Sequence, residues 1–293
     1  HRAFVALQGA EKTLQHNSFR VFIQRGIAWA ARRENINALC TPDELAHLGY
    51  PAGGPSRPED TVRKFEVHPD FTVTAVASEP LIIKPIAVNW DARGRMWVAE
   101  TPEYPNGRRE TVTDTWKETS ALQPGQYQRP ARDRISILSD TNGDGVFDSK
   151  SIFYEGLELV TGFCFYKDGI IAVHQPDLVW LRDTDGDGKA DKEERLFTGF
   201  KPGDSHFVAN HLIPGADGWI YVSMGGGEEI RSPDGKKHFG RVTSGMFRFK
   251  PDGSVIEQVS SKGGNGFGAD ITSDGELFFG QATSGNPLQH VVI

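Results

Sequence analysis

Residues 209–222 have the sequence Ala-Asn-His-Leu-Ile-Pro-Gly-Ala-Asp-Gly-Trp-Ile-Tyr-Val, in which an apolar run, a glycine-containing turn and an apolar-aromatic run follow one another. The segments 86–99, 162–173 and 267–280 have the same order. This order is typical of a β-hairpin. The turn glycines are Gly94, Gly169, Gly218 and Gly275, and the polar insert 102–132 widens the first interval. Intervals of about 50 residues are typical of four-stranded β-propeller blades.

We therefore expect an all-β chain. It should be a partial β-propeller of about four blades, spanning residues 65–293, with an N-terminal strand-helix remnant of another domain. The last hairpin lies close to Ile293, and four blades cannot readily close a ring if the parent propeller has six or more. A blade edge would then stay unpaired, so we expect the propeller to be incomplete.

The N-terminal segment differs from the rest of the chain. Residues 2–7 indicate a strand, and residues 17–33 a helix, because Phe19, Phe22 and Ile27 recur at helical spacing. One strand is less than a domain needs to pack against, so residues 1–40 indicate the end of a domain. Proline and glycine in residues 41–64 indicate a linker.

Composition excludes some partners. The 293 residues carry a net charge of −7, which disfavours nucleic acid or an anionic membrane surface as the main partner. No apolar stretch approaches the roughly 20 residues that cross a bilayer. The two cysteines, Cys40 and Cys164, match no metal or redox spacing, and Cys164 lies in an apolar run typical of a buried position.

Two acidic loops, residues 140–148 and 183–191, predict calcium sites. Oxygen ligands at positions 1, 3, 5, 7 and 9, with glycine at position 6, suit a hard cation. Strand-like runs flank both loops, so they would close hairpins. The alternative is a pair of solvated Asp-Gly turns without metal. The predicted ligands are Asp140, Asn142, Asp144, Val146 and Asp148 in the first loop, and Asp183, Asp185, Asp187, Lys189, Asp191 and Glu194 in the second, with Val146 and Lys189 offering backbone carbonyls.

Three histidines are candidate functional residues. His206 precedes the first strand of the third hairpin, where inner strands meet the propeller channel, and is the candidate general base. His211 lies within that strand and His174 ends the second hairpin, so both are candidate cofactor-binding residues. The alternative for each is a structural histidine whose ring is hydrogen-bonded inside the fold.

The propeller resembles a family called membrane-bound dehydrogenases, found in very large exported bacterial proteins and named for its similarity to soluble quinoprotein sugar dehydrogenases. The motifs that carry the resemblance are Phe71-Thr-Val-Thr-Ala-Val-Ala-Ser-Glu-Pro, Pro85-Ile-Ala-Val-Asn-Trp-Asp-Ala-Arg-Gly-Arg-Met-Trp-Val-Ala-Glu, Arg132-Asp-Arg-Ile-Ser-Ile-Leu, Ala216-Asp-Gly-Trp-Ile-Tyr and Ala282-Thr-Ser-Gly-Asn-Pro-Leu-Gln-His-Val-Val.

The resemblance implies a periplasmic or extracellular module that oxidises a sugar or alcohol. It implies calcium and pyrroloquinoline quinone as cofactors, a channel histidine as base, and a haem domain elsewhere in the same parent chain. Residues 1–33 resemble the end of a trehalose-utilisation (ThuA-like) domain, an α/β fold, through Arg2-Ala-Phe-Val and the helix that begins at Asn17. The other hypothesis is a non-catalytic propeller scaffold that binds carbohydrate or a protein partner.

Overall fold

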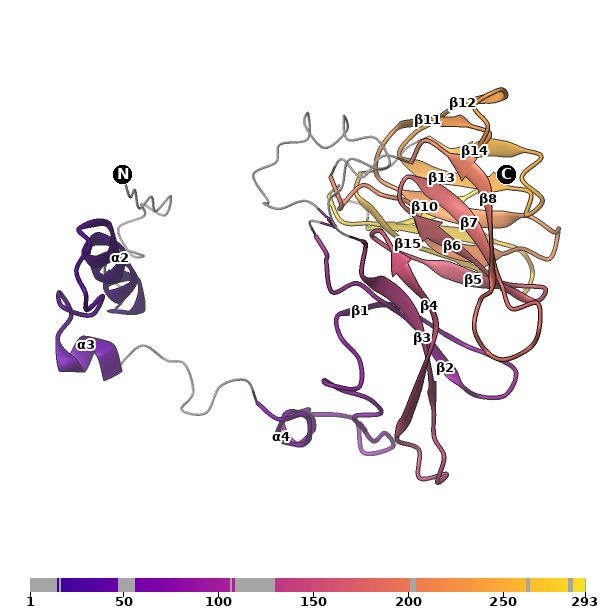
Figure 1. Cartoon of the computed structure of the whole chain (residues 1–293). Helices are drawn as coiled ribbons and strands as arrows, with labels where there is room; N and C mark the ends of the chain where they lie inside the picture. Colours follow the sequence, from indigo (N-terminus) through magenta and orange to yellow (C-terminus); the bar gives the residue numbers. More distant parts are fainter. Residues whose placement is uncertain are drawn as a thin grey trace. The chain divides into compact units, whose positions relative to one another are not determined.

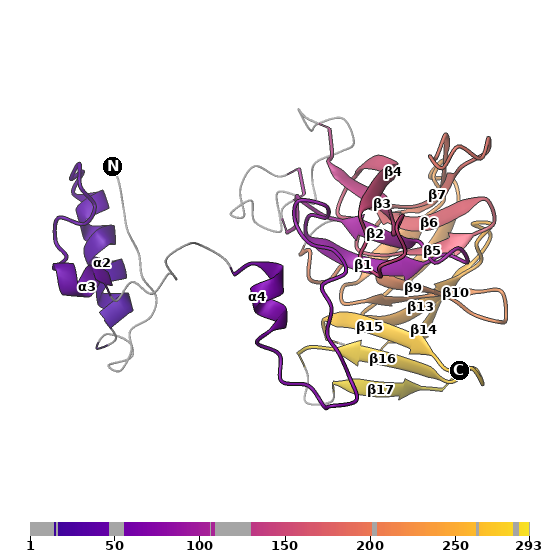
Figure 2. The same ribbon diagram turned by 90° about the horizontal axis from the view of Figure 1, so that it is seen from below.

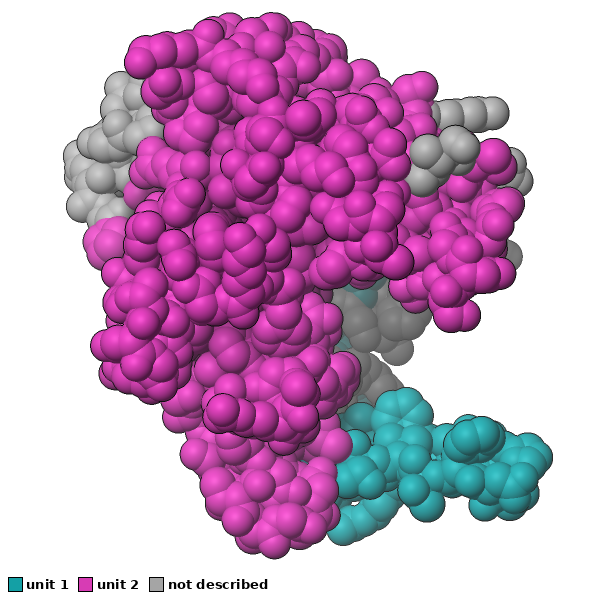
Figure 3. Space-filling model, turned by 90° about the vertical axis from the view of Figure 1, so that its right-hand side faces the viewer, with its two compact units in different colours: residues 1–75 teal, residues 76–293 magenta. Residues whose placement is uncertain are grey.

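The computed structural model describes residues 15, 17–46, 56–105, 107–108, 130–200, 204–261, 264–283 and 287–292. The chain divides into two compact units, residues 1–75 and residues 76–293 (Figure 3).

The first unit contains helices α2 (Asn17–Ala30), α3 (Pro42–Ala46) and α4 (Pro58–Val62). Helix α2 lies within the predicted 17–33 but ends three residues earlier, because Arg32 adopts a left-handed conformation (φ 57°) and the Arg33 N–H bonds back to the Ala28 carbonyl. The strand predicted at residues 2–7 lies outside the described residues.

Two of these helices lie in the segment that the sequence indicated as a linker. Helix α3 begins with a reciprocal cap: the Glu44 N–H donates to Thr41 Oγ1 (3.2 Å), and the Thr41 N–H donates to Glu44 Oε2 (2.9 Å). This pattern satisfies amides that the first helical turn leaves unpaired. Helix α4 has Pro58 at its start, where the missing N–H costs nothing.

The second unit is built from antiparallel strands in the described part of the chain, so the all-β prediction is confirmed at this level (Figure 1). The strands are β1 (Pro85–Trp90), β2 (Met96–Glu100), β3 (Asp133–Ser139), β4 (Ser149–Leu157), β5 (Phe163–Tyr166), β6 (Gly169–His174), β7 (Asp177–Arg182), β8 (Lys192–Thr198), β9 (Asn210–Pro214), β10 (Ile220–Met224), β11 (Glu228–Arg231), β12 (His238–Val242), β13 (Gly245–Phe249), β14 (Ile256–Ser260), β15 (Gly266–Ile271), β16 (Leu277–Gln281) and β17 (Leu288–Val291).

The strands form four sheets that succeed one another along the chain (Figure 2). Sheet I has the order β1-β2-β3-β4, sheet II contains β5-β6-β7-β8, sheet III has β9-β10-β13-β14, and sheet IV has β15-β16-β17. The first two strands of each sheet are the four hairpins that the sequence predicts. Consecutive meanders of this kind are propeller-like.

The hairpin β11–β12 departs from this simple order. In the sequence it lies between β10 and β13 of sheet III, yet β11 pairs with β8 at the outer edge of sheet II through Arg231 and Thr198. The hairpin therefore covers an outer edge that would otherwise expose unpaired amides.

The turn glycines are required for two different reasons, backbone conformation and space. Gly94, Gly218 and Gly275 have φ of 75°, 75° and 92°, which favours glycine. In the second hairpin the left-handed residue is Lys167 (φ 48°) instead. Gly169 is needed for space, because a Cβ there would lie 1.9 Å from the Leu181 carbonyl oxygen.

Period-two alternation explains how the sheets stack. In β6, Ile170 and Ala172 pack toward sheet I, whereas Ile171 and Val173 pack toward sheet III. A third cluster joins sheet III to sheet IV through Tyr221 and Phe279. Sheet II is thus buried on both faces, as expected of a blade between two blades.

The first strands of the four sheets lie around one cavity. Residues of β1, β5, β9 and β15 line a space of about 440 Å³, and Asn89 Nδ2 on β1 donates to the Phe163 carbonyl on β5 (2.9 Å). This is the position of a propeller's central channel. We call it the channel cavity.

Candidate functional site

A second cavity lies at the strand ends where sheets II and III meet. It has a volume of about 220 Å³, and we call it the rim cavity. It is built from the β6–β7 turn, the segment before β9 and the loop between β10 and β11. Its described lining residues are Gln175, Phe200, Asp204, Phe207, Val208, Ala209, Met224, Gly226, Gly227 and Glu228.

Gln175 is the buried polar residue of this lining. It sits in the turn between β6 and β7, where its backbone N–H donates to the Glu158 carbonyl (2.9 Å). The residue is 1% exposed. Among the residues that the structure describes, neither its Oε1 nor its Nε2 has a hydrogen-bond partner. A buried carboxamide with both atoms unsatisfied is uncommon and requires an explanation.

His206 and Asp204 form a pair at the edge of the rim cavity. His206 Nδ1 lies 2.6 Å from Asp204 Oδ1, and the Asp204 side chain also accepts from the His206 N–H (2.9 Å). The His206 side chain is 55% exposed and that of Asp204 19%. A carboxylate accepts, so Nδ1 is the donor of this pair, and in the neutral imidazole Nε2 is then the acceptor. The ring of Tyr104, which follows β2, packs edge-on against the His206 ring, with 6.3 Å between the ring centroids.

The other two predicted histidines lie elsewhere. His174 Nδ1 accepts from the Glu158 N–H (2.9 Å), and burial lowers the pKa of its ring despite the nearby Glu193 and Asp177 carboxylates. His174 therefore has a satisfied structural position at Nδ1. It is next to Gln175 in the sequence but is not among the described residues that line the rim cavity.

His211 lines the channel cavity. Its backbone is left-handed (φ 51°), and its Nδ1 lies 3.0 Å from Asn210 Oδ1. Burial lowers the pKa of the ring, while Asp270 on the neighbouring strand β15 opposes that shift. The structure thus does not bring His206 and His211 to one cavity.

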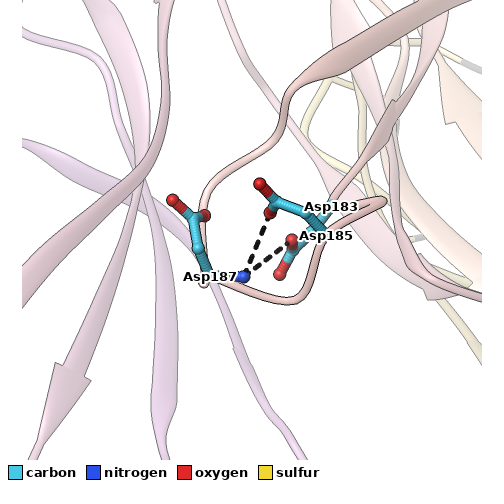
Figure 4. Close-up of side chains that lie close together, drawn as sticks. All are labelled: Asp183, Asp185 and Asp187. Carbon is cyan, nitrogen blue, oxygen red and sulfur yellow. Dashed lines mark hydrogen bonds between the residues drawn. The ribbon is translucent and has the colours of Figure 1, made fainter.

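The second acidic loop gathers three carboxylates. Ligand atoms of Asp183, Asp185 and Asp187 lie within 4.8 Å of one another (Figure 4). Asp183 accepts from the N–H groups of Gly186 (2.7 Å) and Gly188 (2.9 Å), which fold the loop around its side chain. This set of hard oxygen donors fits calcium, which these three carboxylates would hold.

The first loop repeats the backbone hydrogen bonds of the second loop but, within the described residues, forms no group of three carboxylates. Asp140 accepts from Gly143 (2.7 Å) and Gly145 (2.8 Å), as Asp183 does in the second loop. These amides lower the pKa of Asp140, with the Gly145 N–H contributing most. The ninth residues, Asp148 and Asp191, both accept from the N–H of the second residue, at 3.0 and 3.1 Å.

The remaining predicted ligands make hydrogen bonds within their own loops or lie outside them. The Asn142 side chain accepts from the Asp144 N–H (2.9 Å), and the Asp144 side chain accepts from the Val146 N–H (2.8 Å). In the second loop, the Lys189 N–H donates to the Asp187 side chain. Glu194 lies within β8, opposite Trp180 and 3.6 Å from Lys192 Nζ. It is outside the three-carboxylate group.

The described lining of the rim cavity does not fit pyrroloquinoline quinone. That cofactor is a tricarboxylate, which calls for cationic partners. Asp204 and Glu228 place two carboxylates on the lining, and the described lining residues include no lysine or arginine. We therefore derive no step through the quinone at this cavity.

The sheets and the rim cavity define a class: a mostly-β, propeller-like chain with a small cavity between neighbouring sheets, whose walls are mostly apolar with a few polar groups. Residues 57–293 match a family model described as "Domain of unknown function (DUF7133)", and the chain belongs to this family. A comparison with curated proteins finds no match. Within the described residues, no helix combines the length and the apolar character needed to cross a membrane.

Three solved structures are similar in part. One is the holo pyranose dehydrogenase PQQ domain from Coprinopsis cinerea, with 12% identity, a TM-score of 0.43, and coverage of 74% of this chain and 49% of that chain. Another is assigned as a gluconolactonase. It has 16% identity and a TM-score of 0.37, and the match covers 75% of this chain and 64% of that chain. The third, from Thermus thermophilus, is assigned as an oxidoreductase (glucose dehydrogenase). It has 15% identity and a TM-score of 0.39, and the match covers 72% of this chain and 63% of that chain. The chain spans about half to two thirds of their lengths.

Sequence reasoning missed Gln175, Tyr104 and Glu228. Gln175 adjoins the candidate His174, and Glu228 directly follows the glycine run 225–227, which indicates a phosphate site only where a helix follows it. No local signal could have joined these segments, because the cavity draws on parts of the chain about 50 residues apart.

Proposed function

We propose that this chain is the propeller module of a periplasmic or extracellular enzyme that oxidises a sugar or alcohol, and that His206 accepts the proton of the substrate hydroxyl. The observation that carries the proposal is the His206–Asp204 pair at the rim cavity. Asp204 holds Nδ1–H, so the half-exposed ring offers Nε2 to a hydroxyl. The exported setting and the haem domain of the parent chain follow from the family resemblance and belong to the same proposal.

The chain's own residues account for binding, orientation and proton uptake. When His206 Nε2 takes the hydroxyl proton, the Asp204 carboxylate stabilises the imidazolium that forms. The two-electron acceptor, a quinone by resemblance, would have to lie beyond the described lining of the rim cavity. Calcium at Asp183, Asp185 and Asp187 would be a structural clip on the β7–β8 hairpin.

The experiment is substitution of His206 in the full-length parent protein. A positioned base contributes roughly 100- to 10,000-fold in rate. We expect His206→Ala to lower turnover by that order in a dye-reduction assay over sugars and alcohols with added quinone. Its thermal midpoint should change little, because the ring is half-exposed.

His238→Ala is the matched control. His238 also pairs with a carboxylate, Glu229, at 2.9 Å, and both side chains are 49% exposed, but the pair lies on the β11–β12 hairpin. Turnover should survive this change. If His206→Ala were as active as the control, the base assignment would be wrong. If the intact parent oxidised none of the compounds, the second candidate, a carbohydrate-binding scaffold, would remain, which Gln175 favours.

A further inference from the structure

We infer that the rim cavity binds a neutral, monosaccharide-sized polyol, and that the Gln175 carboxamide recognises its hydroxyl groups. This inference rests on the proposed function, because it assigns the substrate class of the same cavity. Binding does not require oxidation, so the two can fail separately.

The first step is the state of Gln175. Its side chain is enclosed by the fold, lines the cavity and has no partner for Oε1 or Nε2 among the described residues. A buried donor or acceptor without a partner destabilises the protein, whereas an apolar side chain of similar size would not. The position therefore suits a residue whose partner is a ligand.

The second step is the chemistry of that ligand. The carboxamide offers two N–H donors and one carbonyl acceptor, so its partner must accept and donate side by side. A hydroxyl does both. An ammonium group only donates, and would leave Nε2 without a partner. A carboxylate only accepts, and would meet the like charges of Asp204 and Glu228 on the lining.

The third step is shape. Phe200, Phe207, Val208 and Met224 give the cavity apolar walls beside its polar groups. The C–H faces of a sugar ring or an inositol ring can pack on such walls while the hydroxyls reach Gln175 and Asp204. The volume of about 220 Å³ suits one ring. Asp204 already holds His206, so the ligand would lie beside the proposed base.

The test measures binding and stability together on the chain itself. The probes are D-glucose and myo-inositol as neutral polyols, with D-gluconate as the anionic counterpart, each titrated calorimetrically. We expect a neutral polyol to bind and D-gluconate to bind more weakly, because its carboxylate meets Asp204 and Glu228. Failure of both neutral probes to bind at about 50 mM, or tighter binding of D-gluconate, would overturn the inference.

Gln175→Leu separates recognition from structure. It should weaken binding of the neutral polyol at least about tenfold, while the thermal midpoint without ligand stays unchanged or rises by a few degrees. A merely structural glutamine predicts the reverse: a lower midpoint and unchanged affinity, which would overturn the inference. Ser223→Ala is the control, since Ser223 Oγ is also buried without a partner in the described structure but lies outside the lining. It should leave affinity unchanged.

The outcomes distinguish this inference from the proposed function. Polyol binding that depends on Gln175, without turnover in the parent protein, would uphold the site and remove the oxidation. Turnover that depends on His206, with wild-type affinity in Gln175→Leu, would remove only the role of Gln175.

Discussion

Three buried carboxyl groups lie close together near the end of sheet I. The Glu103 side chain is 1% exposed and pairs with Arg132 at 3.1 Å, and the Glu158 side chain is 3% exposed and pairs with Arg108 at 2.6 Å. Asp133 instead accepts two backbone bonds, from Glu103 (3.3 Å) and Val160 (3.4 Å). Burial, with the charges of Glu103 and Glu158 adding to it, raises the pKa of Asp133 to about 7.

Asp133 should make stability fall as pH rises. Its folded pKa of about 7 exceeds the ordinary 3.8, so its favourable contribution is complete below about pH 4 and is lost as pH rises through about 7. The loss amounts to up to about 4 kcal/mol. We expect Asp133→Asn to flatten the decline in unfolding free energy between about pH 5 and 7, measured by urea denaturation.

Glu100 provides the opposite sign in the same sheet. Burial disfavours its charge, but hydrogen bonds from Arg134, Lys150, Ser136 and the Ile83 N–H outweigh burial and lower the pKa of Glu100 to about 2. Its contribution is complete above about pH 4.5 and is lost as pH falls from there through about 2, below the window used for Asp133. An unchanged slope in Asp133→Asn would therefore contradict the role of Asp133 directly.

At the scale of elements, the two acidic loops act on hairpins. One joins β3 to β4 and the other joins β7 to β8, and in each a single aspartate accepts amides from across the turn. Each loop is thus held by hydrogen bonds to the side chain of its own first aspartate. A cation would add a further link between two strands that are already paired within a sheet.

Calcium should stabilise the chain through the second loop. With a dissociation constant of about 0.1–1 mM, typical of extracellular modules, about 2 mM calcium adds about 0.6–1.8 kcal/mol to the free energy of unfolding. Asp185→Asn should remove most of this gain, measured by urea denaturation in calcium and in chelator.

Asp234→Asn is the matched control for the calcium experiment. Asp234 also lies in an exposed hairpin turn, where it accepts from the Ser232 hydroxyl (2.6 Å), but it belongs to no group of three carboxylates in the described part of the chain. The calcium gain should persist in this variant. If calcium stabilised neither the wild type nor the control, the metal assignment of the loop would be wrong.

At the scale of the whole molecule, the two units differ in family match and in exposed apolar surface. The family match begins at residue 57 and the β unit at residue 76. In the first unit, Phe22, Ile27 and Trp29 of α2 are 49%, 50% and 43% exposed, whereas Val21 and Ala28 are buried. Large apolar side chains exposed along one helix favour association.

Removing residues 1–56 should leave the β unit folded. The sheets draw their cores from residues after 76, so the far-ultraviolet circular dichroism of 57–293 should keep its β character. Light scattering should show less association than for the full chain, because the exposed face of α2 is gone. Loss of the β spectrum would instead show that the first unit is required for folding.

The sequence by itself determined the features that act over a few residues. Alternation and turn chemistry predicted all four hairpins, and the spacing of carboxylates at positions 1, 3 and 5 predicted the Asp183–Asp187 group, because these patterns are local. Tertiary structure decided the rest: the pairing of β11 with β8, the separation of His206 from His211, and the burial of Gln175. Burial and cavity shape depend on which distant segments meet, and the turn at Gln175, the segment at Asp204 and the loop at Glu228 meet only when sheets II and III stack.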